Sequence, residues 1–254
     1  MSRKLSQEQI DTFRRDGVLT GIAIDSPEQA AHFRRQFDQL EATEGTERAQ
    51  NRIFDRHFDE QFLWDIATHP RILDCVESLY GPNLLLLSTH VFCKYGPSDG
   101  FVAWHQDLTY WGIEPLEEVT AWYAIDDSDR ENGCMRVIPK HQGQRILEHG
   151  KSREAGNLLS INQAVDVSPE VEATAVDCVL RAGEISLHDG TAIHGSLPNR
   201  SNRRRCGVTV RYVPAHVRPL AEGPIGTDWK WRPILVRGEY AYTHFKLAEP
   251  PFPT

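Results

Sequence analysis

The sequence has no excess of positive charge, no closely spaced cysteine pair and no long hydrophobic run. Its 36 acidic residues outnumber its 28 Lys and Arg residues and give a formal net charge of -8. This charge argues against nucleic acid or an anionic membrane as a partner, because both attract basic surfaces. The five cysteines have no C-x-x-C spacing typical of zinc and redox motifs, and no stretch approaches the roughly 18 apolar residues of a membrane span. We therefore expect a cytoplasmic protein with free thiols that acts on a small molecule.

Helix signals are concentrated in the first third of the chain. Ser6 and Gln9 form a capping box, and Gly17 is a natural C-terminal stop. Ser26 directly precedes Pro27, an order typical of a helix start. The expected helices span about 7–16, 27–42, 59–68 and 71–80, and the polar segment 43–58 is expected to be a loop.

Strand signals replace helix signals from Leu84 onward. Short apolar runs are separated by turn residues, without the strand–helix alternation of a doubly wound parallel sheet, so the pattern predicts a barrel or sandwich. The expected strands are Leu84–Val91, Val119–Ile125, Met135–Ile138, Asn157–Ile161, Glu184–Leu187, Cys206–Val213 and Pro233–Arg237. One domain, 1–254, is expected, with a helical part over about 1–82, a β core over about 83–215 and a C-terminal extension over about 216–254.

Two short motifs, far apart in the chain, carry candidate metal ligands. Residues two apart on a strand point to the same face, so His105 and Asp107 can bind one ion, and His194 can supply a third ligand from another strand. Two imidazoles and one carboxylate leave coordination positions open, which suits Fe(II) with a bidentate cosubstrate and O₂ better than a closed structural zinc site. The H-x-D motif alone is weak evidence, because a single histidine is more often a core or surface residue.

Arg205 adds a candidate anion-binding group. It lies eleven residues after His194, in an expected strand, and its guanidinium can hold a dicarboxylate through paired hydrogen bonds. The alternative is a solvated basic turn formed by Arg200, Arg203, Arg204 and Arg205. We expect two or three of these four side chains to be solvated.

Six segments in order carry a family resemblance. They are the leader from Leu5 to Gly17, His105-Gln106-Asp107-Leu108-x-Tyr110, Trp122, Asn132-Gly133-Cys134-Met135-x-Val137-Ile138-Pro139 with His141, His194-Gly195-Ser196-x-x-Asn199, and Arg205. With these segments the chain resembles the phytanoyl-CoA dioxygenase-like (PhyH) family of Fe(II)/2-oxoglutarate oxygenases, to about residue 215. The resemblance implies a mainly β fold with flanking N-terminal helices, in which a double-stranded β-helix, a jelly-roll or cupin-like barrel, holds the metal at its mouth.

The resemblance also implies roles for the matching residues. Iron and catalysis are implied for His105, Asp107 and His194, and binding of the 2-oxoglutarate C5 carboxylate for Arg205 with Ser196 beside it. Trp122 matches a position near the cosubstrate, and a core aromatic is an equally good interpretation. Related halogenases have a small residue in place of Asp107, so its presence favours hydroxylation. The implied reaction uses O₂, converts 2-oxoglutarate to succinate and CO₂, and hydroxylates an unactivated C–H bond.

The substrate is less well defined by the sequence. Candidate lining residues are Phe92, Lys94, Tyr110, Trp111, Arg136 and Arg211. Their positive charges favour an acidic or amino-acid-like substrate, although Lys94 and Arg136 can also extend to solvent. Whether the substrate is free or bound to a carrier as a thioester stays open, as does the oligomeric state.

Several other features have two interpretations. His90 either faces the pocket or packs in the core, and His188 belongs to a strand end and turn near the metal. His141 either faces the substrate or closes a loop. The segment 149–175 is expected to cover the pocket, and 217–232 to form a lid or a dimer contact.

Two other functions use the same residues. A zinc-dependent hydrolase can employ two histidines and one aspartate with bound water as the nucleophile. It leaves Arg205 and Ser196 without a purpose and works without O₂. A non-catalytic, cupin-like binding protein does not need the full set of three ligands.

Overall fold

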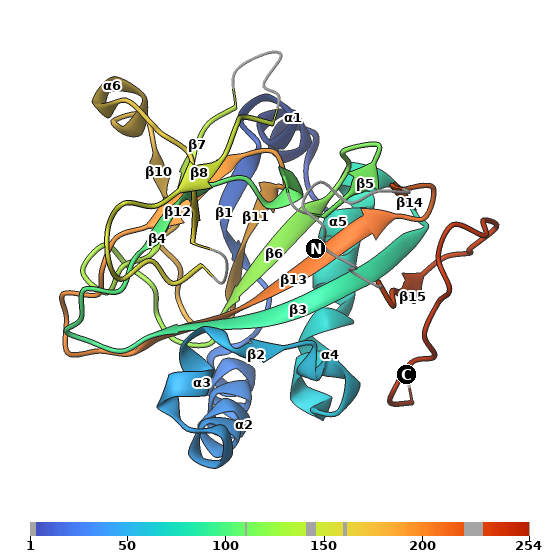
Figure 1. Ribbon diagram of the computed structural model, residues 1–254. Helices are drawn as coiled ribbons and strands as arrows, with labels where there is room; N and C mark the ends of the chain where they lie inside the picture. Colours follow the sequence, from blue (N-terminus) through green and yellow to red (C-terminus); the bar gives the residue numbers. More distant parts are fainter. Residues whose placement is uncertain (1–3, 110, 141–145, 160–161, 221–230, 254) are drawn as a thin grey trace.

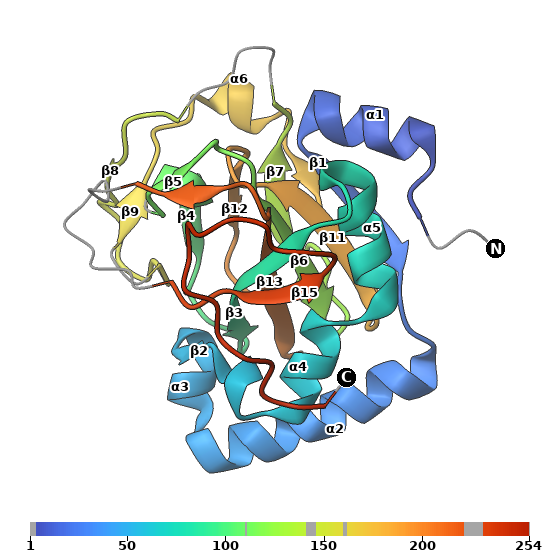
Figure 2. The ribbon, with the colours of Figure 1, turned by 90° about the vertical axis from the view of Figure 1, so that its right-hand side faces the viewer.

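The computed structural model describes residues 4–109, 111–140, 146–159, 162–220 and 231–253. Two antiparallel β-sheets face each other, and helices cover the outer face of the larger sheet (Figures 1 and 2). This arrangement confirms the expected mainly β fold with flanking N-terminal helices. None of the described helices combines the length and the apolar character that crossing a membrane requires.

Four expected helices are confirmed. The first, α1 (Gln7–Asp16), starts at the Ser6 capping box and ends at Gly17, whose φ of 72° is the left-handed conformation that glycine adopts readily. The others are α2 (Pro27–Glu44), α4 (Gln61–Ala67) and α5 (Pro70–Tyr80). A short helix, α6 (Pro169–Glu172), follows much later in the sequence.

The expectation of a loop over 43–58 is wrong in part. This segment contains α3 (Thr46–Asn51), β2 (Ile53–Phe54) and the 3₁₀ turn η1 (Arg56–Phe58). The helix α3 buries only Ala49, so it lacks the apolar stripe from which a helix is recognised in a sequence. It is held by contacts with the large sheet, which the local sequence does not encode.

The larger sheet has the strand order β1-β11-β6-β13-β3-β15, with β2 also paired to β3. Its strands are β1 (Val18–Ala23), β3 (Leu84–Lys94), β6 (Val119–Ala124), β11 (Glu184–Asp189), β13 (Arg205–Pro214) and β15 (Ile234–Arg237). The strand β1 was not expected, because it follows α1 directly within a part of the sequence dominated by helix signals.

The smaller sheet has the order β10-β7-β12-β4. Its strands are β4 (Val102–His105), β7 (Met135–Ile138), β10 (Val176–Asp177) and β12 (Ile193–Ser196). Two further pairs of short strands are β5 (Ile113–Glu114) with β14 (Arg218–Pro219), and β8 (Gly150–Lys151) with β9 (Gln163–Ala164). A strand was expected at Asn157–Ile161, but over 157–159 only an isolated bridge from Asn157 to Phe101 is present.

The alternation of side chains along β13 separates the core from the pocket. Side chains of one parity, exemplified by Val208 and Tyr212, pack under the helices, and the Tyr212 hydroxyl donates a hydrogen bond to the Ala67 carbonyl of α4 at 2.8 Å. Side chains of the other parity, Arg205, Thr209 and Arg211, line the space between the sheets. The buried core therefore fixes the positions of two arginines in the interior.

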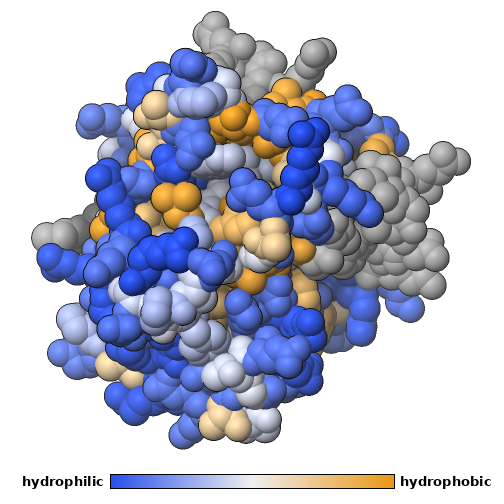
Figure 3. Space-filling model, turned by 60° about the vertical axis from the view of Figure 1, so that its left-hand side comes forward, coloured by the Kyte–Doolittle hydropathy of each residue, from blue (hydrophilic) through white to orange (hydrophobic). Residues whose placement is uncertain are grey.

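The surface turned forward in Figure 3 is mostly hydrophilic, and its hydrophobic side chains gather near the centre of that face. This distribution agrees with a chain in which charged residues make up 25% of the sequence.

Candidate active site

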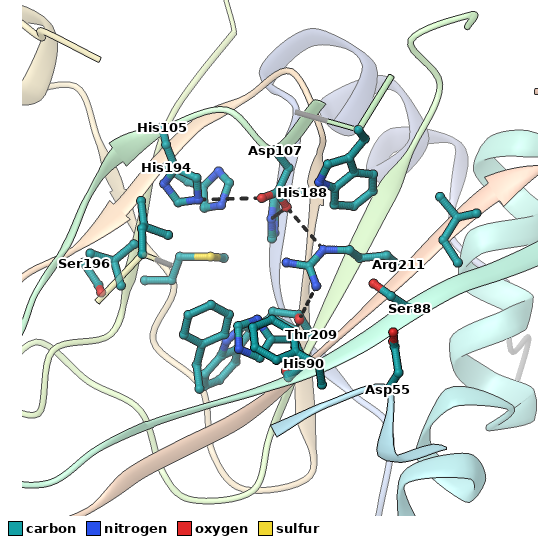
Figure 4. A pocket seen from close by; sticks show the side chains of 18 of the residues that line it. Asp55, Ser88, His90, His105, Asp107, His188, His194, Ser196, Thr209 and Arg211 are labelled. Carbon is teal, nitrogen blue, oxygen red and sulfur yellow. Dashed lines mark hydrogen bonds and ion pairs between the residues drawn. The ribbon is translucent and has the colours of Figure 1, made fainter. Parts of the chain in front are cut away.

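A cavity of about 430 Å³ lies between the two sheets (Figure 4). Its volume lies within the usual range for small-molecule pockets. His105 and His194 line it from the smaller sheet, and Trp122 and Arg211 line it from the larger one. All three expected metal ligands face this space, together with residues from distant parts of the chain.

Two paired strands bring the expected ligands together. His105, the last residue of β4, lies directly opposite His194 of β12 in the strand register. Asp107 begins a 3₁₀ turn, η2 (Asp107–Thr109), and its Oδ1 lies 3.6 Å from His105 Nε2. One ligand atom from each residue lies within 4.8 Å of the other two. The expectation that His105 and Asp107 share one strand is wrong, because β4 ends at His105 and the chain turns there.

The side chain between the two ligands points away and fixes this turn. Gln106 is fully buried, and its amide donates to the Thr191 carbonyl at 2.6 Å. Its amide oxygen accepts a hydrogen bond from the Leu147 backbone N–H at 2.8 Å. The turn is therefore tied to the two neighbouring loops.

Hydrogen bonds to backbone carbonyls set the tautomer of both histidines. His105 Nδ1 lies 2.9 Å from the Ala103 carbonyl oxygen, and His194 Nδ1 lies 3.1 Å from that of Ala192. A carbonyl only accepts, so Nδ1 carries the proton and the lone pair of Nε2 is available for a metal. Burial, with His105 and His188 nearby, also holds the pKa of His194 well below its usual value, which keeps the imidazole neutral. These two histidines and Asp107 fit a divalent cation.

The outer oxygen of the Asp107 carboxylate is surrounded by three polar side chains. Its Oδ2 lies 3.4 Å from Thr120 Oγ1, 3.7 Å from Arg211 Nε and 3.9 Å from His188 Nε2. Burial raises the pKa of this carboxyl, but Arg211, His105 and His188 outweigh it and hold that pKa well below its usual range. Asp107 is therefore a carboxylate, with Oδ1 directed at the histidines.

A second group of polar side chains lies at the other end of the cavity. The Arg205 side chain is buried, donates to the Gly133 carbonyl from Nε and Nη2 at 3.2 and 2.8 Å, and lies over the Trp122 ring at 5.3 Å. Lys94, its partner in the strand register, donates to Ser196 Oγ at 2.6 Å. In the described part of the chain, no carboxylate oxygen lies within 4.0 Å of either cation.

Two of the candidate substrate residues do not line the cavity. Arg136 points to the opposite side of β7 from Met135, which lines the cavity, and it forms ion pairs with Glu172 at 2.7 Å and with Asp177 at 3.3 Å. Lys94 lies behind Ser196. The expectation that these two residues line the substrate pocket is therefore wrong, and strand parity explains the error for Arg136.

The structure places three of the remaining candidates in the cavity. Phe92, Trp111 and Arg211 line it, as do His90 and His188, whereas Tyr110 and His141 lie outside the described residues. Leu159 and Trp231, from the two segments expected to cover the pocket, also line it. Sequence reasoning missed several lining residues that no motif marks, among them Phe54, Asp55, Phe58, Ser88 and Thr209.

The close approach of β13 to β6 requires glycine at position 207. A Cβ atom there would lie 2.1 Å from Trp122 Cζ2. We expect Gly207→Ala to destabilise the fold by about 1–3 kcal/mol, the usual cost of overpacking a core, in a chemical unfolding experiment. Gly150→Ala is the matched control, because nothing lies within 4 Å of its added methyl group. Equal unfolding free energies for the two variants would contradict the packing described here.

Comparison with known proteins identifies the family. Residues 9–207 match the family model described as phytanoyl-CoA dioxygenase (PhyH). The chain belongs to this family. It is similar to the peroxisomal phytanoyl-CoA dioxygenase of Bos taurus, with 25% identity over 96% of this chain and 80% of that protein.

Comparison with solved structures agrees with the membership of this chain in the PhyH family. The non-heme monooxygenase ThoJ in its apo form superimposes with a TM-score of 0.73 and 28% identity, over 94% of this chain and 86% of that one. CytC3 with Fe(II) and alpha-ketoglutarate gives a TM-score of 0.69 and 25% identity, over 98% and 94%. The chain is thus an Fe(II)- and 2-oxoglutarate-dependent dioxygenase with a jelly-roll fold, and O₂ is its further cosubstrate.

Proposed function

We propose that this PhyH-family enzyme hydroxylates an unactivated C–H bond of a small metabolite, with conversion of 2-oxoglutarate to succinate and CO₂. The observation that carries the proposal is the convergence of His105, Asp107 and His194, which would hold Fe(II), at the centre of one cavity. Two imidazoles and one carboxylate leave coordination positions for a cosubstrate and O₂. Asp107 would take the coordination position that a halide needs, which favours hydroxylation over halogenation.

Arg205, with Ser196 beside it, would bind the C5 carboxylate of 2-oxoglutarate. The charge balance supports this role, because the buried Arg205 guanidinium has no carboxylate oxygen within 4.0 Å among the described residues, and a ligand carboxylate would offset the cost of burying it. The Ser196 hydroxyl accepts its hydrogen bond from Lys94, so its own proton is available to a ligand. Trp122 forms a flat wall beside the Arg205 guanidinium and restricts where this carboxylate can lie.

The bound iron would supply the activation of O₂ that C–H oxidation requires. The chain contributes position and shielding from water. Arg205 and Ser196 line one part of the cavity and Arg211, beside Asp107, lines another, so the cosubstrate and the substrate would bind in different parts of one space. Thr120, Arg211 and His188 surround the outer oxygen of Asp107 within 3.9 Å, which favours the orientation that directs Oδ1 at the histidines.

The dependence on metal and oxygen tests the proposal against a zinc hydrolase. Metal-free protein is loaded with Fe(II) or Zn(II), and succinate formed from 2-oxoglutarate is measured in air and under nitrogen with a panel of amino acids and acyl thioesters. We expect succinate only with Fe(II) in air, and faster formation with the true substrate class. Absence of succinate with folded, Fe(II)-loaded protein in air, together with hydrolysis of an acyl thioester by the Zn(II)-loaded protein under nitrogen, would contradict the oxygenase function and favour a hydrolase.

A further inference from the structure

Beyond the metal ligands and Arg205, two residues of opposite charge, Arg211 and Asp55, line the cavity, and a further cation, Arg232, lies over the Phe58 ring at 5.4 Å. Arg211 projects from β13, and Asp55 lies between β2 and η1 on the far side of β3 (Figure 4). Neither was brought to the cavity by a sequence motif that the family resemblance rests on. The positions of Arg211 and Asp55 determine where charged groups of a substrate can bind.

Arg211 has hydrogen-bonding capacity to spare. Its Nη1 donates to Thr209 Oγ1 at 3.0 Å, and its guanidinium lies over the Trp111 ring at 5.1 Å. Within the described part of the chain, Nη2 donates no hydrogen bond and the buried Nε has no partner at hydrogen-bond distance. The nearest carboxylate oxygen, Oδ2 of Asp107, is 3.7 Å away. A carboxylate in the cavity can therefore bind this guanidinium.

Asp55 is held in an unusual conformation that directs its carboxylate into the same space. Its φ of 51° lies in the left-handed region, which is uncommon for residues other than glycine and is often found at functional sites. Two hydrogen bonds to Thr89 fix it, one from the Thr89 N–H to Oδ1 at 3.0 Å and one from its own N–H to the Thr89 carbonyl at 2.8 Å. This geometry leaves Oδ2 free for a ligand.

The Asp55 carboxylate lacks a close cationic partner. Among the described residues, no Lys or Arg nitrogen lies within 4.0 Å of its oxygens, and the side chain of Asp55 is half exposed because it faces the cavity. Partial burial raises the pKa of this carboxyl, and the Thr89 hydrogen bond and the Arg211 charge offset part of that rise. A ligand cation would complete this site.

Aromatic side chains also line this cavity. The Phe54 and His90 rings stack with their centroids 3.8 Å apart, and Phe92 lies 4.0 Å from His90. All three line the cavity. This aromatic wall, formed by Phe54, His90 and Phe92, can contact an apolar hydrocarbon group and, through the ring faces, an ammonium group.

We propose that the substrate is a small zwitterion of the amino-acid type, with its carboxylate on Arg211, its ammonium group on Asp55 and its hydrocarbon part against the aromatic wall. This inference rests on the proposed function of the site. A fatty-acyl thioester would leave the Asp55 carboxylate unpaired, and an aminoacyl thioester would leave the Arg211 guanidinium without a carboxylate, because its carboxyl carbon is bonded to sulfur. The cavity of about 430 Å³ must also hold 2-oxoglutarate, which favours a substrate of amino-acid size in the remaining space.

Equilibrium binding to the anaerobic Fe(II)- and 2-oxoglutarate-loaded enzyme tests the proposal. The twenty L-amino acids are the probes, and binding is measured by calorimetry together with the change they cause in the visible absorption of the complex. We expect at least one to bind with a Kd below about 1 mM. Its carboxamide, which lacks the carboxylate, and its deamino acid, which lacks the ammonium group, should each bind roughly tenfold to a hundredfold more weakly.

Two substitutions assign each charge to its residue. Arg211→Gln should weaken the amino acid by roughly tenfold to a hundredfold and leave the affinity of its carboxamide almost unchanged. Asp55→Asn should weaken the amino acid by a similar factor and leave the affinity of its deamino acid almost unchanged. Asparagine tolerates the left-handed conformation, and its side-chain oxygen can still accept the hydrogen bond from Thr89. Arg200→Gln and Asp65→Asn, which lie outside the cavity, are the matched controls.

The outcomes separate this inference from the proposed function. If 2-oxoglutarate itself produces no absorption change with Fe(II), the proposed function fails and this inference fails with it. If 2-oxoglutarate binds but none of the amino acids does, the substrate class is wrong and the proposed function stands. Equal affinity for the amino acid and its carboxamide, or binding unaffected by Arg211→Gln, also overturns the assignment.

Discussion

Replacing Asp107 with alanine is expected to abolish turnover by removing the only carboxylate among the three expected metal ligands. Loss of one partner from a buried charged contact costs about 3–5 kcal/mol, so Fe(II) affinity should fall by roughly a hundredfold to several thousandfold. The removal also leaves Arg211 and His188 facing an empty space. Fe(II) binding, measured by competition with a chelator, and succinate formation at saturating metal give the two readouts.

A matched substitution shows that the effect is local. Asp99→Ala removes a carboxylate that is 89% exposed and pairs with Arg200 on the surface, and it should leave both readouts unchanged. If Asp107→Ala bound Fe(II) as tightly as the natural chain and still turned over, the carboxylate would not be a ligand and the triad would have to be redefined.

Replacing Arg205 with glutamine is expected to raise the Kd for 2-oxoglutarate by a factor of roughly thirty to several thousand. Removing one member of a buried, hydrogen-bonded charge pair costs about 2–5 kcal/mol. At saturating 2-oxoglutarate, kcat should change much less, because Arg205 is not one of the three expected metal ligands. The ratio of the two effects therefore distinguishes loss of an anchor from general damage to the site.

The surface arginine Arg203 provides the control for this substitution. Arg203→Gln breaks exposed ion pairs with Asp129 and Glu131 and should leave the affinity for 2-oxoglutarate unchanged. If Arg205→Gln left that affinity intact while Arg211→Gln reduced it, the anchor for the cosubstrate would be Arg211. The assignment of the two ends of the cavity would then be reversed.

The fold and the convergence of the expected metal ligands were predictable because their signals are local or repeated. The capping box at Ser6 and the apolar strands leave a clear pattern in the sequence. His105 and His194 are far apart in the sequence, but they lie opposite each other because their strands pair directly. Arg205 was singled out by its spacing, and the structure places it in the same cavity.

The parts of the site that were missed depend on tertiary contacts. Asp55 reaches the cavity through a single left-handed residue held by Thr89, and no composition rule marks such a position. Arg136 was assigned to the wrong side of β7 because one residue of strand register reverses the direction of a side chain. Lys94 was recognised as a cation of interest, but its contact with Ser196 arises only when β3 and β12 are brought together.

Anaerobic titration of the Fe(II)-loaded chain with 2-oxoglutarate tests the central claim most directly. We predict a visible metal-to-ligand charge-transfer band that grows to saturation with one 2-oxoglutarate per chain, and its loss in His194→Ala and, at moderate concentrations of 2-oxoglutarate, in Arg205→Gln. The absence of this band in folded, Fe(II)-loaded protein would contradict the assignment of the cavity as an iron and 2-oxoglutarate site.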